Sequence, residues 1–116
     1  YVLRGVKFSI DFRGGIGKDV EFTLTEEEMQ NFDHFTLKFR VADYRLPLPD
    51  LRVQINGQTV FLRRPPVGFF EESFSKDVFG NSLTLDLKNK LSLSFDRQAF
   101  YSVADATLLV FRRSVM

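Results

Sequence analysis

The sequence predicts an all-β protein, an antiparallel two-sheet jelly-roll-like sandwich with at most one short helix. Apolar and polar residues alternate in at least six short segments, as in strands with one buried face. Gly, Pro, Asn and Asp separate these segments. Asn56-Gly57 also lies between two alternating runs, and it favours a type I′ hairpin because both central residues need positive φ. We therefore expect about eight or nine strands in a single domain, residues 1–116.

The first third of the chain contains two predicted strands and the only helix signal. The predicted elements are strands at 6–12 and 20–24, a flexible turn at 14–17 and a helix near 26–32. Thr25 and Glu28 have the spacing of a capping box, in which each side chain bonds the other residue's backbone amide. This pattern predicts a helix of one or two turns.

The rest of the chain is predicted to be strands and turns. The predicted strands are 35–41, 51–55, 58–62, 70–79, 83–87, 91–95 and 104–111. The segment 44–50 contains two prolines, which cannot lie in a central strand, so it is predicted to be a loop. Gly80-Asn81 and Lys88-Asn89-Lys90 are predicted turns. The continuous apolar run 108–111 predicts a central last strand that is buried on both faces.

The 14 phenylalanines are expected to fill most of a thin core between the two sheets. Alternation within each predicted strand indicates which side chains face inward. The predicted core positions are Phe8, Ile10, Phe22, Leu24, Leu37, Phe39, Val53, Leu85, Leu93 and Leu109.

The composition argues against several classes of function. With 16 Lys+Arg and 15 Asp+Glu, the chain has no net field to attract nucleic acid or an anionic membrane. The absence of Cys excludes disulfides, thiolate catalysis and Cys-type zinc sites. No apolar run is long enough to span a bilayer, so we expect membrane attachment only through a segment outside this chain. The chain starts at Tyr1 rather than Met, and we expect it to be part of a longer protein.

No pattern in the sequence predicts catalysis, and we expect a protein that is not an enzyme and needs no cofactor. His34 has no nucleophile or base partner indicated by spacing. Glu26–Glu28 are explained by a helix start, where acidic side chains are stabilised. Gly14–Lys18 lacks the spacing of a phosphate-binding loop. No metal site is predicted, although a calcium ion near Asp43 and Asp50 is left open.

The order of strand and turn motifs resembles that of the galactose-binding-like jelly-roll sandwiches. The resemblance covers residues 20 to 112 and depends on four segments: Phe35–Val41, Val53–Gly57, Asn81–Leu85 and Ala106–Val110. That superfamily includes sugar-binding modules, accessory domains of glycosidases and interaction domains. The resemblance implies a binding or structural module rather than an enzyme.

Aromatic and arginine side chains in the predicted loops form the candidate binding site. Exposed clusters of this composition are common at the energetic centres of interfaces. Prolines in two of the loops would reduce the entropy lost on binding. The candidate residues are Tyr44, Arg45, Arg63, Arg64, Phe69, Phe70 and Tyr101.

The first functional hypothesis is a non-catalytic structural or protein-interaction module, the extracytoplasmic or cell-surface part of a larger assembly. Its partner would be another protein or a second copy of itself. The alternative hypothesis is a carbohydrate-binding module, and the absence of Trp weakens it. A nucleic-acid-binding domain is the third, because basic pairs such as Arg112-Arg113 would permit phosphate contacts.

Overall fold

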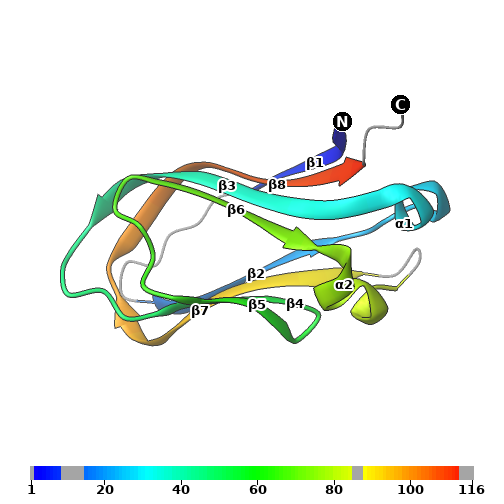
Figure 1. Ribbon diagram of the computed structural model, residues 1–116. Helices are drawn as coiled ribbons and strands as arrows, with labels where there is room; N and C mark the ends of the chain where they lie inside the picture. The colour runs from blue at the N-terminus through cyan, green and yellow to red at the C-terminus, as the bar shows by residue number, and fades with distance from the viewer. Residues whose placement is uncertain (1, 9–14, 85–87, 113–116) are drawn as a thin grey trace.

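Two antiparallel four-stranded sheets pack face to face in the computed structural model, which confirms the all-β sandwich (Figure 1). The structure describes residues 2–8, 15–84 and 88–112. In the first sheet the strand order is β1 (Val2–Phe8), β8 (Tyr101–Arg112), β3 (Phe32–Tyr44) and β6 (Phe69–Ser75). In the second sheet it is β2 (Gly15–Phe22), β7 (Asn89–Ala99), β4 (Leu51–Ile55) and β5 (Gln58–Arg63).

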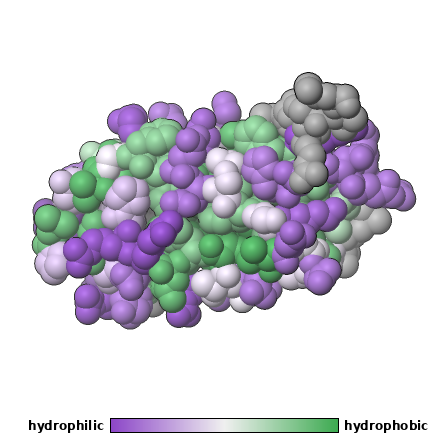
Figure 2. Space-filling model, viewed as in Figure 1, coloured by the Kyte–Doolittle hydropathy of each residue, from purple (hydrophilic) through white to green (hydrophobic). Residues whose placement is uncertain are grey.

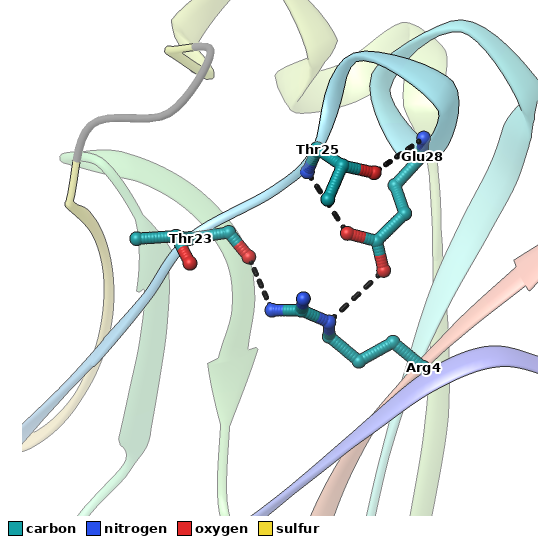
Figure 3. A network of polar contacts seen from close by, with 4 residues as sticks. All are labelled: Arg4, Thr23, Thr25 and Glu28. Carbon is teal, nitrogen blue, oxygen red and sulfur yellow. Dashed lines mark hydrogen bonds and ion pairs between the residues drawn. The ribbon is translucent and has the colours of Figure 1, made fainter.

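The predicted helix is present as α1 (Glu26–Asn31), and its capping box is complete. The Thr25 amide donates to Glu28 Oε1 over 2.9 Å, and the Glu28 amide donates to Thr25 Oγ1 over 3.2 Å. Arg4 of β1 extends this network by pairing with Glu28 (2.9 Å) and donating to the Thr23 carbonyl (2.7 Å; Figure 3). The edge strand of the first sheet is thereby joined to the connection that leaves the second sheet.

The Asn56-Gly57 hairpin joins β4 to β5, as predicted, with φ of 49° and 85° at its two central residues. The Asn56 side chain also makes tertiary contacts. Its amide donates to the Ser82 carbonyl (2.7 Å) and to Asn89 Oδ1 (2.9 Å), and its oxygen accepts from the Lys90 amide (2.7 Å). The hairpin tip is therefore held against the start of β7.

Several predicted boundaries need correction. The strand predicted to reach Phe79 ends at Ser75, whose hydroxyl caps a second helical turn, α2 (Lys76–Phe79), followed by the 3-10 turn η1 (Gly80–Ser82). Of the predicted strand 83–87, residues 83 and 84 are not in a strand, and 85–87 lie outside the described residues. Two predicted turns also begin strands, since β2 starts at Gly15 and β7 starts at Asn89. Asn89 is buried, and its side-chain amide is satisfied by hydrogen bonds with Thr84 and Asn56.

The core lies between the sheets and is rich in aromatic side chains, as expected. Phe8 is partly buried and packs against the core, whereas Ile10 and Leu85 lie outside the described residues. The predicted core positions that are buried are Phe22, Leu24, Leu37, Phe39, Val53 and Leu93.

The prediction that Leu109 faces the core is wrong, and a β-bulge explains why. β8 is central, as predicted, but two of its residues, Asp105 and Ala106, lie opposite the single residue Phe39 of β3. Before the bulge the odd-numbered residues face the core, and after it the even-numbered residues do, from Ala106 to Val110. Leu109 therefore lies on the half-exposed outer face, and the strand is fully buried on one face only.

Candidate binding site around Phe69

Three loops that carry predicted site residues meet at the end of the sandwich opposite the two helices (Figure 1). The Arg45 amide donates to the Phe100 carbonyl over 3.1 Å. The Tyr101 hydroxyl donates to the Pro66 carbonyl over 2.7 Å. The Val41 amide of β3 donates to the Gly68 carbonyl over 2.8 Å. The loops 45–50 and 64–68 and the β7–β8 connection at Phe100 are thus held side by side.

Two of the predicted binding residues belong to the core. Phe70 is 1% exposed and stacks on Phe39 with 4.5 Å between the ring centroids. Tyr101 is fully buried, its ring packs edge-on against Phe39 and Phe95, and burial raises the pKa of its hydroxyl. Neither side chain can meet a partner on the surface. Their role is to support the loops from below, most directly through the Tyr101–Pro66 hydrogen bond.

Five predicted residues are exposed at this end. The Arg45 guanidinium lies 4.6 Å from the centre of the Phe100 ring, beside the half-exposed Tyr44. Arg63 and Arg64 follow one another at the end of β5, and both are exposed. Phe69, at the start of β6, is 57% exposed and is therefore the most accessible of the described aromatic rings.

Phe69 lies between two hollows in the surface. It is opposite Arg40 on β3, and β6 is the edge strand of the first sheet. The first hollow, of about 380 Å³, extends from Phe69 across β3 and β8. The second, of about 280 Å³, lies on the other side of β6, toward β5. We call Phe69 and the charged residues of both hollows the Phe69 site: Lys38, Arg40, Arg63, Arg64, Phe69, Glu71, Glu72 and Asp105.

The first hollow contains Asp105, the outward-facing residue of the β8 bulge. Its φ of 56° is left-handed, a conformation that Asp adopts more readily than most residues. The carboxylate lies 3.7 Å from Arg40, and Lys38 pairs with Glu71 over 3.6 Å. Strained backbone and bulges are common next to functional sites, where they redirect a side chain.

The second hollow has a similar pair. Arg63 binds Glu72 over 3.0 Å and lies 4.8 Å from the centre of the Phe61 ring. Arg64 lines the same hollow, and no carboxylate within the described part of the chain lies within ion-pair distance of it. Both hollows therefore offer hydrogen-bond donors beside acceptors.

Sequence reasoning identified Phe69, Arg63 and Arg64 but missed the residues that β3, β6 and β8 contribute. The alternation of the predicted strand 35–41 places Lys38 and Arg40 only on its polar face, and no pattern in the sequence singles out Glu72. One signal for Asp105 does exist in the sequence. A charged residue stands between Ala104 and Ala106, where the alternation of the last strand is interrupted.

Neither the calcium alternative nor a catalytic histidine gains support from the geometry. Among the described residues, no group of three or more His, Asp or Glu side chains is placed to hold a metal ion. The carboxylate of Asp43 instead accepts from the Tyr44 amide over 2.9 Å. His34 stacks on Phe111 with 4.9 Å between ring centroids and contacts Asp33. No helix in the described ranges is long and apolar enough to cross a membrane.

Comparison with known proteins identifies a fold class rather than a family. No family model matches the chain, and no curated protein matches it in sequence. Among solved structures, it is similar to the native structure of a family 35 carbohydrate binding module from Clostridium thermocellum. The TM-score is 0.51 at 10% sequence identity, over 93% of this chain and 89% of that one. The protein therefore shares the two-sheet antiparallel β-sandwich fold of that structure.

Proposed function

We propose that this domain is a non-catalytic binding module that holds a carbohydrate at the Phe69 site. The observation that carries the proposal is the exposed Phe69 ring, on a hydrogen-bonded strand between two hollows lined with charged side chains. A sugar ring has an apolar face that packs on an aromatic ring, and hydroxyls around its edge that need donors and acceptors. The Phe69 site supplies both kinds of contact.

The structural neighbour supports this proposal through its fold. That protein is a carbohydrate binding module, and the same arrangement of two sheets can present a rigid surface to a glycan. At 10% identity the similarity extends to the fold alone, so the ligand class depends on the side chains of this chain.

A protein partner is the second candidate, and a separate observation favours it. Leu46 and Val67 are 68% and 47% exposed in the two proline-containing loops at this end of the sandwich. Figure 2 shows hydrophobic residues among hydrophilic ones on the visible face of the molecule. Aliphatic loop tips suit a protein interface better than a sugar. Nucleic acid is less favoured, because Lys38, Arg40 and Arg63 are already paired with carboxylates.

Titration of the domain with a panel of oligosaccharides tests the proposal, with backbone amide chemical shifts and calorimetry as readouts. We expect Phe69→Ala to weaken glycan binding about tenfold or more. Val78→Ala is the matched control, since Val78 is 50% exposed on α2 at the opposite end, and it should bind normally. Absence of glycan binding, or normal binding by Phe69→Ala, would overturn the proposal. Saturable protein binding that Leu46→Ser and Val67→Ser abolish would favour the second candidate.

A further inference from the structure

The arrangement of the Phe69 site also indicates which kind of glycan it would bind, if the proposed function is correct. We propose that the site binds at least two consecutive units of a neutral glycan chain, one unit on each side of Phe69. The ligand would be an internal segment of the chain passing over the ring, and not a single terminal sugar.

The position of Phe69 on an edge strand is the first argument. One side of β6 pairs with β3, and its other side faces β5, so the two hollows lie on opposite sides of the same strand. The Phe69 ring borders both of them. A single sugar could occupy one hollow, whereas a chain crossing the ring would occupy both and bury the ring between them.

The second argument is the matched polar pair in each hollow. Arg40 lies 3.7 Å from Asp105 in the first, and Arg63 lies 3.0 Å from Glu72 in the second. A guanidinium only donates hydrogen bonds, and a carboxylate only accepts them. Two neighbouring hydroxyls of a sugar can satisfy such a pair together, because each hydroxyl both donates and accepts.

The charges argue for a neutral ligand. Of the four cations in the Phe69 site, Lys38, Arg40 and Arg63 each face a carboxylate. An anionic sugar would place its charge beside these acids, and like charges at close range oppose binding. Arg64 then contributes a further donor to the second hollow.

The backbone conformation of Asp105 is a further argument, and it concerns the role of the Asp105 carboxylate in binding. Its side chain is 84% exposed, so the core does not require it, yet its backbone is left-handed. A glycine would satisfy that backbone without strain. Asp105 supplies what glycine lacks, a carboxylate directed toward Arg40 at the edge of the first hollow.

The test is calorimetric titration with neutral cello-, xylo- and manno-oligosaccharides of increasing length, and with oligogalacturonate as the anionic probe. For a neutral series that binds, we expect affinity to rise about tenfold between the monosaccharide and the short oligomers and then to level off. Addition of about 0.5 M NaCl should leave the affinity for the neutral oligosaccharides unchanged, because no net charge is neutralised on binding.

Asp105→Asn and Glu72→Gln probe the two hollows separately. Each should weaken oligosaccharide binding about fivefold or more, and only one of them should affect a monosaccharide. Asp19→Asn and Glu21→Gln are matched controls, because both are exposed, ion-paired acids on β2 in the other sheet. Asn tolerates the left-handed backbone at 105, so Asp105→Asn should keep the fold.

The outcomes separate this inference from the proposed function. If no glycan binds, both are overturned. If glycans bind in a Phe69-dependent way but the monosaccharide binds as tightly as the longest oligomer, only the two-unit inference fails. It also fails if Asp105→Asn and Glu72→Gln bind normally, or if oligogalacturonate binds more tightly than every neutral series.

Discussion

At the scale of the residue, Asp105 combines backbone strain with a surface position. Its left-handed conformation places one extra residue in β8, and its side chain faces solvent beside Arg40. A non-glycine residue held in this region costs about 1–3 kcal/mol. A strained and exposed residue contributes little to stability. The effect of a substitution at Asp105 on the free energy of unfolding should therefore be independent of its effect on binding.

Substitution of Asp105 tests this separation. Asp105→Gly should leave the free energy of unfolding unchanged or raise it by up to about 1 kcal/mol, because glycine relieves the strain. Asp105→Val should lower it by about 1–3 kcal/mol, since a β-branched residue resists positive φ. Urea denaturation measures both. A Val variant as stable as the original protein would contradict the left-handed backbone at this position.

Because the Tyr101 hydroxyl is buried, we expect the free energy of unfolding to depend on pH. Burial raises its pKa in the folded state, so folding favours the neutral phenol. This contribution is complete below the unfolded pKa of about 10 and is lost as pH rises above that value. The stability advantage of the original protein over Tyr101→Phe should therefore be about 1 kcal/mol near neutral pH, from the bond to Pro66, and should narrow above about pH 10.

Urea denaturation from neutral pH to beyond about pH 10 checks the sign of this effect. Other groups titrate over the same range, and the difference between the two proteins cancels most of their contribution. A gap that stays constant across the range would show that the Tyr101 phenol ionises in the same way in both states.

At the scale of the element, the β4–β5 hairpin depends on more than its turn. Local sequence explains the positive φ of Asn56 and Gly57. The Asn56 amide then joins the hairpin to Ser82 and to the buried Asn89. One residue therefore both permits the turn and holds the hairpin to a neighbouring strand.

Replacing Asn56 by Gly separates these two roles. Gly keeps the backbone conformation but removes the side-chain bonds to Ser82, Asn89 and the Lys90 amide. The free energy of unfolding should fall by about 1–3 kcal/mol, because buried polar groups lose their partners. Gly57→Asn is the control, because it keeps these bonds, Asn tolerates positive φ better than most residues, and a Cβ there meets nothing within 4 Å apart from its chain neighbours. A stable Asn56→Gly variant would show that the turn alone is needed.

At the scale of the whole molecule, one aromatic core supports the candidate site. Phe39 stacks on Phe70, and Tyr101 packs edge-on against Phe39 between the two sheets. Phe70 is the neighbour of Phe69, so the exposed ring is placed by a buried one. The rigidity of the site thus derives from the packing of the sandwich.

Two Phe→Ala substitutions should show the contrast between core and surface. Phe39→Ala, at a position 1% exposed, should lower the free energy of unfolding by about 3–5 kcal/mol. Phe69→Ala should lower it by about 1 kcal/mol or less, because the ring is mostly in solvent. Thermal and urea denaturation give both values. Comparable losses would show that Phe69 is part of the core and would remove the basis for a surface site.

The sequence by itself determined most of the strands, the hairpin and α1, because each is encoded by local chemistry. Alternation, an Asn-Gly pair and a capping box act over a few residues and need no knowledge of neighbouring strands. The same local rules failed at Asn89, whose amide is used in a tertiary cluster and not in a turn. They failed also at Ser75, where a helical turn replaces the end of a strand.

Only the tertiary structure decided which side chains are available for binding. Alternation requires Phe69 and Phe70 to face opposite ways, but the position of the second sheet determines that Phe70 is the buried one. The bulge at Asp105 reverses the inward face of β8 and leaves Leu109 on the outside. The Phe69 site is built from β3, β5, β6 and β8, and strand pairing across long sequence separations brings its residues together. No local pattern encodes such pairing, because it depends on how the whole chain buries its apolar surface.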